Sequence, residues 1–237
     1  MFEVATHLAL LLILAGFVAG FVDSIAGGGG LITVPALLLA GANPLQALAT
    51  NKLQGTFGAG TAMVTYARAG HVRLQDQLLM AAVSAASGAA GALVAHLIPA
   101  DVLRLTMPVI LIAVALFFAL KPGLSDHDRV ERMKPAVFTF TAVPLIAAYD
   151  GFFGPGTGSF FMIGFVMLAG FGVLKATAHT KTLNFASNIG SLLVFIPSGA
   201  TWWAVGIAMA LAQVAGASLG ARLAMRVGAK LIKPLLV

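Results

Sequence analysis

Two lysines lie inside long apolar stretches, where a positive charge is costly unless it is paired or hydrated. Lys52 belongs to the segment ATNKLQ (49–54), and Lys181 belongs to HTKTLN (179–184). A Lys ammonium group offers three donors and a compact positive charge, which suits a small oxyanion. The alternative is that Lys52 lies near a helix end and extends its ammonium group to the lipid headgroups. Neighbouring polar side chains are expected to add neutral hydrogen bonds to the anion: Thr50, Asn51, Gln54, Thr180 and Asn184.

A glycine-rich stretch precedes each lysine by about 22 residues, namely DSIAGGGGL (23–31) and GPGTGS (154–159). Glycine costs a helix about 1 kcal/mol per residue, and backbone freed at membrane depth must line a cavity or be buried in protein. The N–H groups that begin the next helix can bind an anion. The alternative is a tight helix crossing that only needs small residues. The predicted substrate-binding residues in these stretches are Gly28, Gly29, Gly30, Leu31, Gly156, Thr157, Gly158 and Ser159.

Three titratable residues near these motifs are candidates for carrying a proton or balancing charge. Asp23 and Asp150 precede the helix breaks, and His179 stands two residues before Lys181. Capping of a helix explains each Asp equally well, and packing explains His179. Because no catalytic motif, cysteine or histidine cluster accompanies them, we expect no enzyme, no metal site and no cofactor.

The composition places these motifs in a membrane protein. Hydrophobic residues make up 59% of the chain and charged residues only 9%, against roughly 25% charged in soluble domains. With a mean hydropathy of +0.99, soluble enzymes and nucleic-acid binders are excluded. The net charge of +6 then reflects Lys and Arg in cytoplasmic loops rather than a nucleic-acid partner. The expected partners are the lipid bilayer and a small anion, and assembly into a homo-oligomer is left open.

Apolar segments predict an all-α, polytopic protein with two halves. They lie near 4–22, 31–42, 45–66, 76–97, 102–120, 136–150, 157–172, 176–196 and 203–226. The halves repeat at a spacing of 129 residues, so that Lys52 falls on Lys181, Gly27 on Gly156 and Gly29 on Gly158. We therefore expect a first membrane repeat (1–120), a charged cytoplasmic linker (121–135) and a second membrane repeat (136–237).

Charge asymmetry predicts that the two repeats are inverted. Loop 67–75 carries Arg68, His71 and Arg73, whereas its repeat partner, 196–204, carries no charge. The asymmetry reverses between 93–101 and 222–230, so the positive-inside rule makes loops 67–75, 121–135 and 222–230 cytoplasmic. Whether the glycine-rich segments cross the membrane or re-enter is left open.

The repeat carries two further expectations. The paired small residues Ser87…Gly91 and Gly216…Gly220 predict that helices 76–97 and 203–226 cross closely. The second copy of segment 102–120 would begin near 228 and run about nine residues past Val237, which favours a truncated final helix.

At these residues the chain resembles the sulfite exporter TauE/SafE family, also called the toluene-sulfonate uptake permease family. The resemblance rests on GFVAGFVDSIAGGGGLITVPALLLAG (16–41) with ATNKLQGTFG (49–58), and on GFFGPGTGSFFMIGF (151–165) with ATAHTKTLNFASNIGS (176–191). It runs from about residue 10 to the end and departs at the C-terminus, where the family has a further hydrophobic helix. Members are inner-membrane transporters associated with sulfite, sulfonates and related organic anions. The resemblance implies that role and location here.

The sequence therefore predicts a secondary transporter, an exporter or permease, that binds a small anion near the membrane midplane between the two breaks and the two lysines. An anion-selective channel is an alternative within the same broad class. A membrane assembly factor without transport of its own is an alternative from another class. The substrate, the direction of transport and the coupling ion are left open.

Overall fold

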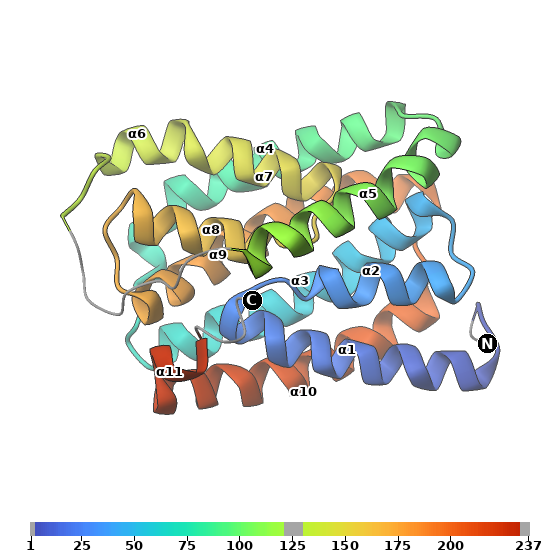
Figure 1. The fold of residues 1–237 in the computed structure, drawn as a ribbon, viewed down its shortest axis with the longest axis horizontal. Helices are drawn as coiled ribbons and strands as arrows, with labels where there is room; N and C mark the ends of the chain where they lie inside the picture. Colours follow the sequence, from blue (N-terminus) through green and yellow to red (C-terminus); the bar gives the residue numbers. More distant parts are fainter. Residues whose placement is uncertain (1–2, 121–129, 233–237) are drawn as a thin grey trace.

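A computed structural model describes residues 3–120 and 130–232 (Figure 1). Part of the expected linker (121–135) lies outside these ranges. The end of the predicted final helix also lies outside them. Within them the chain folds into helices, as predicted, and no strand occurs. The helices are α1 (Thr6–Ala26), α2 (Gly30–Leu39), α3 (Pro44–Arg68), η1 (Leu74–Gln77), α4 (Leu78–Leu97), α5 (Ala100–Ala119), α6 (Pro135–Phe140), α7 (Ala142–Phe152), α8 (Thr157–Met167), α9 (Val173–Phe195), η2 (Ile196–Ser198), α10 (Trp203–Val227) and α11 (Ala229–Ile232).

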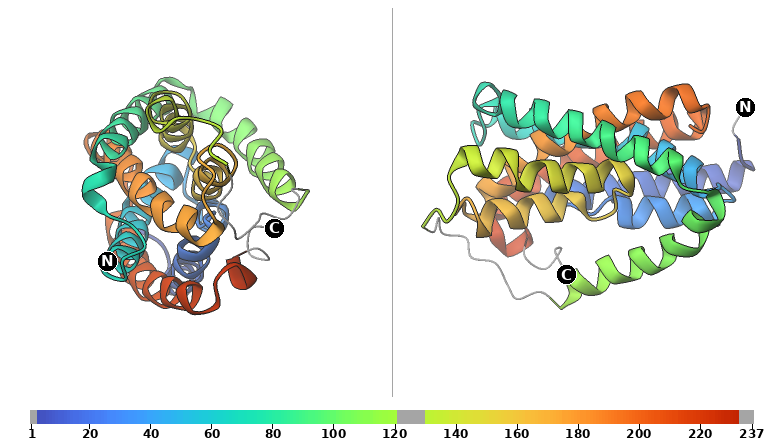
Figure 2. Two further views of the ribbon diagram at one scale, coloured as in Figure 1. Left: turned by 90° about the vertical axis from the view of Figure 1, so that its left-hand side faces the viewer. Right: turned by 90° about the horizontal axis from the view of Figure 1, so that it is seen from above.

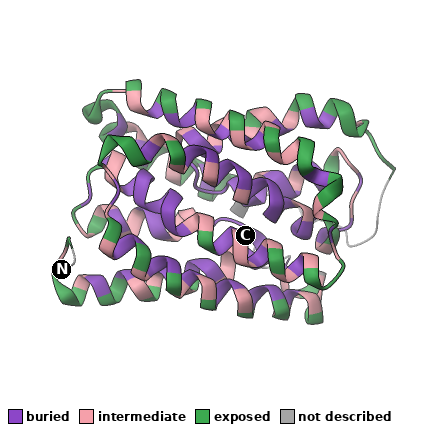
Figure 3. Ribbon diagram, turned by 180° about the vertical axis from the view of Figure 1, so that it is seen from behind, coloured by how far each residue is buried: buried purple, intermediate pink, exposed green. Residues whose placement is uncertain are grey.

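Five helical stretches in the described ranges are long and apolar enough to cross a membrane: Thr6–Ala26, Leu74–Leu97, Ala100–Phe117, Pro135–Phe152 and Trp203–Val227. Their outer faces carry large apolar side chains that no other part of the described chain covers. Leu97, Leu105 and Leu145, for example, are 83%, 76% and 73% exposed. Figure 3 shows exposed residues on the outside of the bundle and buried residues between the helices. Such a surface suits contact with lipid rather than water.

Local sequence explains where several helices begin and end. Asn43 caps α3 through a reciprocal pair of hydrogen bonds with Gln46, and Pro44 occupies the first helical position. The predicted segment 136–150 forms two helices, α6 and α7, which meet at Thr141. Pro144 explains this break, because a proline lacks the N–H group for the helical bond and its ring clashes with the carbonyl four residues earlier.

The packing of the helices links the two predicted repeats. α1 packs along α10, α4 packs along α7, and α3 and α9 lie against each other in the middle. α5 lies on the outside of the bundle, with contacts mainly to α3 (Figure 2). Helix α1 of the first predicted repeat therefore lies against α10 of the second, and α7 of the second lies against α4 of the first.

The small-residue pairs make close crossings, but with partners other than those predicted. A Cβ atom at Gly91 would overlap the Ala148 carbonyl of α7, and one at Gly216 would overlap the Phe17 carbonyl of α1. α4 and α10 do not form a packed pair. The expectation that helices 76–97 and 203–226 cross each other is therefore wrong, because each small stripe faces a helix of the opposite repeat.

Helix α1 and the α6–α7 segment run in opposite directions along the bundle. In Figure 1, α1 runs from right to left, whereas α6 and α7 run from left to right. α2 turns back toward the end where α1 began, and α8 turns back toward the end where α6 began. The connections from α3 to α4 and from α10 to α11 lie at the left end of the bundle, and those from α4 to α5 and from α9 to α10 lie at the right end.

Candidate functional site

Lys52 and Lys181 are both buried, and each forms an ion pair with a carboxylate from the other predicted repeat. Lys52 Nζ lies 2.8 Å from Asp150 Oδ1, and Lys181 Nζ lies 3.2 Å from Asp23 Oδ2. Lys181 also donates a hydrogen bond to the backbone carbonyl of Asp23. Since the Lys52 side chain is 0% exposed, it does not extend to lipid headgroups. The first repeat thus supplies one lysine and one carboxylate, and the second supplies the partner of each.

Helix ends hold the two carboxylates in place. α1 runs to Ala26, beyond the predicted boundary at residue 22, so Asp23 lies in its last turn. There one carboxylate oxygen of Asp23 accepts a hydrogen bond of 3.2 Å from the Gly29 amide. Asp150 lies near the end of α7, and its Oδ2 accepts a hydrogen bond of 2.6 Å from the Ser187 hydroxyl of α9. Both carboxylates therefore have a fixed partner besides the lysine.

The two glycine-rich stretches touch each other. A Cβ atom at Gly27 would overlap the backbone of Gly158 and Ser159, so only glycine fits at this contact. Ser159 donates a hydrogen bond of 2.9 Å from its hydroxyl to the Ala26 carbonyl. Gly27 and Gly156, which the predicted repeat relates, both have a φ of 86°, a value that favours glycine. The ends of α1 and α7 and the starts of α2 and α8 therefore meet at one place in the bundle.

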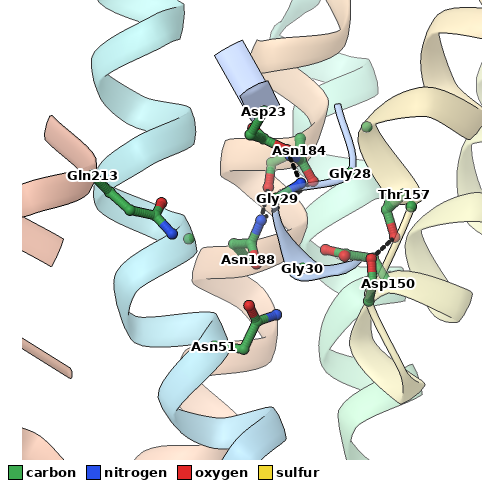
Figure 4. A pocket seen from close by; sticks show the side chains of 14 residues that line it. Asp23, Gly28, Gly29, Gly30, Asn51, Asp150, Thr157, Asn184, Asn188 and Gln213 are labelled. Atoms are coloured by element: carbon green, nitrogen blue, oxygen red, sulfur yellow. Dashed lines mark hydrogen bonds between the residues drawn. The ribbon is translucent and has the colours of Figure 1, made fainter. Parts of the chain in front are cut away.

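A small cavity of about 30 Å³ lies at this meeting point (Figure 4). A volume of this size holds one or two water molecules. Two carboxylates line it together with glycine backbone and side-chain amides. The two lysines are not among the lining residues, and each is paired with one of these carboxylates. Its lining residues are Asp23, Gly28, Gly29, Gly30, Asn51, Gly55, Asp150, Gly154, Gly156, Thr157, Gly158, Asn184, Asn188 and Gln213.

Ten of the residues singled out from the sequence line this cavity, and the others lie nearby or elsewhere. Gln54 does not line it, but its Oε1 accepts a hydrogen bond of 2.7 Å from Gln213. Ser159 is engaged with Ala26, and Leu31 lies in the first turn of α2 outside the lining. Thr180 is buried, and in the described chain its hydroxyl has no hydrogen-bond partner.

His179 is not brought to the cavity. Its Nδ1 lies 2.7 Å from Gln77 Nε2, and its ring packs against Phe165 and Phe171. Through these contacts His179 of α9 meets η1 and α8, and it does not contact either ion pair. The structure thus separates His179 from the two carboxylates with which the sequence grouped it.

Four lining residues were missed by the sequence analysis: Gly55, Gly154, Asn188 and Gln213. Asn188 follows Asn184 by one helical turn and donates a hydrogen bond of 2.7 Å to its carbonyl. The spacing of four residues was a signal that could have found it. Gln213 is an isolated amide in the apolar helix α10, and a lone polar residue in a membrane helix is a signal of the same kind.

A larger groove of about 530 Å³ lies between α3, α9 and α10 and includes Arg68 and Arg222. Its lining also contains Phe57 and Val64, which are exposed on the outer surface of the bundle. Since both buried ion pairs lie at the central cavity, we take the cavity, and not this groove, as the candidate site.

An apolar helical bundle that encloses buried charges around a polar cavity defines a multi-pass membrane protein with a polar interior. A model of the sulfite exporter TauE/SafE family matches residues 12–237. The chain belongs to this family of membrane transporters.

Relatives of the chain are described in the same terms. "Probable membrane transporter protein ORF9" of Sinorhizobium sp is 61% identical, over 99% of this chain and 90% of the relative. "Probable membrane transporter protein YfcA" of Escherichia coli K12 is 46% identical, over 100% of this chain and 88% of the relative. A "Probable membrane transporter protein" of Haemophilus influenzae is 40% identical, over 99% and 92%. No solved structure matches the chain.

Proposed function

We propose that this chain is a secondary transporter of small anions such as sulfite, sulfonates or related organic anions, and that it acts in the cell inner membrane. The observation that carries the proposal is the pair of buried ion pairs, Lys52–Asp150 and Lys181–Asp23, on either side of one polar cavity. Buried ionisable groups in membrane helices are costly and mark substrate and ion pathways. Membership of the TauE/SafE family supports the transport role.

The proposed mechanism is alternating access between two inverted repeats with interrupted helices. The packing supports this arrangement, because exchanging the repeats turns the α1–α10 contact into the α7–α4 contact. The same exchange carries Lys181 onto Lys52, but it carries Asp23 onto Phe152, two residues from Asp150, so the two ion pairs are similar without being strictly equivalent. At the repeat spacing, the helix ends at Ala26 and Phe152 agree to within three residues, and the restarts at Gly30 and Thr157 agree to within two. Two such halves can rock against each other around a central site.

The bound anion would replace each carboxylate as a partner of the lysines. Its oxygens would meet Lys52, Lys181 and the backbone at the starts of α2 and α8, with amide donors from Asn51 and Asn184. The present cavity has room for water but not for an organic anion. Substrate entry therefore requires the cavity walls to move apart, which fits alternating access better than a permanently open pore.

Counterflow in proteoliposomes tests the proposal. Vesicles are loaded with unlabelled sulfite or ethanesulfonate, and entry of the labelled anion is followed with no net gradient. We expect saturable exchange of at least one of these anions. Exchange should fall at least tenfold in Lys181→Ala, which removes a donor of the site. Lys175→Ala removes an exposed lysine of the same helix beside Phe171, and should exchange like the wild type.

The test also separates the alternatives. A channel passes labelled anion rapidly without trans-stimulation. An assembly factor exchanges none of the anions and tolerates Lys181→Ala. If neither anion is exchanged and neither raises the thermal stability of the protein, the proposed function is wrong.

A further inference from the structure

We propose that the anion moves together with a proton, and that the carboxylates of Asp23 and Asp150 are the groups that take the proton. This inference rests on the proposed function and names the ion to which anion transport is coupled. Each carboxylate lines the cavity, and each is paired with a buried lysine that is not part of the lining.

The formal charges of the site cancel. Two lysines and two carboxylates make a site with no net formal charge. An anion that enters alone leaves the buried site with an uncompensated negative charge, which is costly where water is scarce. A proton that enters with the anion keeps the site neutral. The paired arrangement therefore favours joint binding of the two ions.

The anion and the carboxylate compete for the lysine. In the present structure Lys52 Nζ lies 2.8 Å from Asp150 Oδ1, so the carboxylate and an incoming anion compete for the same ammonium group. When hydronium transfers its proton to the carboxylate, water is released and a neutral carboxylic acid remains. The lysine keeps its positive charge and loses its ionic partner, which leaves it available to the anion. Release of the anion and return of the proton to water restore the ion pair.

The surroundings leave these two carboxylates as the exchangeable groups. α2 and α8, which form two sides of the cavity, contain no titratable residue. The only titratable residue of α4 is His96, which bonds to the Ala92 carbonyl and packs on Phe195. Tyr66 of α3 and Tyr149 of α7 are hydrogen bonded to backbone carbonyls, of Ser24 and Pro155 respectively.

The remaining charged or titratable groups of the packed helices lie at other places. Arg68 of α3 and Arg222 of α10 line the outer groove, and Arg226 lies in the last turn of α10. On α9, His179 contacts Gln77, and Lys175 lies over Phe171. His7 is in the first turn of α1, at the end opposite to Asp23, and Lys230 is in α11. None of these groups lines the cavity.

The wild-type protein provides the decisive measurement. Proteoliposomes carry a pH-sensitive dye in the lumen, and potassium with valinomycin holds the membrane potential near zero. The probe is ethanesulfonate, which is fully ionised near neutral pH and so carries no proton itself. Sulfite replaces it if only sulfite shows counterflow, with protein-free liposomes as the blank. An inward anion gradient should acidify the lumen. For one proton per anion, about one pH unit of gradient, acid outside, should drive about tenfold accumulation.

Variants locate the proton sites. The quantity compared is the accumulation ratio with and without the pH gradient, because absolute rates of the variants are expected to fall. The ratio should approach one in Asp23→Asn combined with Asp150→Asn, since neither amide can take the proton. Asp76→Asn removes an exposed carboxylate of η1 and should keep the wild-type ratio. If the double variant does not fold, the dye measurement on the wild type decides.

The outcomes separate this inference from the proposed function. Counterflow with no lumen acidification and no response to the pH gradient overturns proton coupling and leaves anion transport standing. Full proton-driven accumulation in the folded double variant also overturns the assignment to these carboxylates. Absence of both counterflow and thermal stabilisation for the two anions rejects the proposed function itself.

Discussion

At the scale of single residues, Lys52 and Asp150 stabilise the fold only as a pair. Removing the lysine leaves the Asp150 carboxylate buried, and within the described chain the Ser187 hydroxyl is then its remaining hydrogen-bond partner. We therefore expect Lys52→Met to lower the free energy of unfolding by about 3–5 kcal/mol, and Lys52→Met with Asp150→Leu to restore most of it. Thermal unfolding in detergent measures both. Equal destabilisation of the single and double variants would contradict this account.

The contact between the two glycine-rich stretches gives a second prediction at this scale. Gly27 and Gly28 have nearly the same backbone, with φ of 86° and 87°. A Cβ atom at Gly28 would have ordinary contacts, whereas one at Gly27 would overlap Gly158 and Ser159. Gly28→Ala should thus cost only the backbone term, about 1–2 kcal/mol. Gly27→Ala should cost more and reduce anion counterflow. Similar stability and exchange in the two variants would argue against a tight contact.

Much of the site's composition was readable from residue types, but its pairing was not. A lysine or a glycine run is conspicuous in an apolar sequence, so Lys52, Lys181 and both helix breaks were found. Asp23 and Asp150 were recognised as charged, yet nothing along the chain indicates that Asp23 meets a lysine 158 residues away. Pairings of this kind follow from how the helices pack, which local sequence does not encode.

At the scale of helices, the close crossings give a third prediction. Gly216→Ala pushes α10 away from α1 at Phe17, and Gly91→Ala pushes α4 away from α7 at Ala148. Each variant should lose about 1–3 kcal/mol, the usual cost of overpacking. Ala215→Val enlarges an exposed position next to Gly216 and should change stability little. Thermal unfolding of the three variants is the measurement, and an effect of Ala215→Val as large as that of Gly216→Ala would show that the crossing is not the cause.

Helix positions were predicted more closely than helix partners. Apolar runs locate nearly every helix, because burial in lipid or protein demands them. Two helix boundaries differ from the prediction. Pro144 breaks the predicted segment 136–150 at Thr141, and α1 continues past Asp23 to Ala26. Partner choice was wrong for the small stripes, since a stripe shows that something packs closely but not which helix does so.

At the scale of the whole molecule, the arrangement of the connections gives a fourth prediction. The α3–α4 connection and the end of α10 lie at one end of the bundle, and the α9–α10 connection lies at the other (Figure 1). The sequence contains no cysteine, so single cysteines report their own side. Ala69→Cys and Arg226→Cys should react from the cytoplasmic side, and Ser198→Cys should react from the opposite side, with an impermeant thiol reagent. Labelling of all three from one side would refute the inverted arrangement.

The pairing of α1 with α10 bears on how the protein is made. The ribosome synthesises Asp23 158 residues ahead of Lys181, which corresponds to roughly 8–30 s at ordinary rates of elongation. Throughout that interval the first helix has neither its ionic partner nor the helix along which it will pack. Biogenesis must therefore keep an early carboxylate-bearing helix near the insertion machinery until the last third of the chain has emerged.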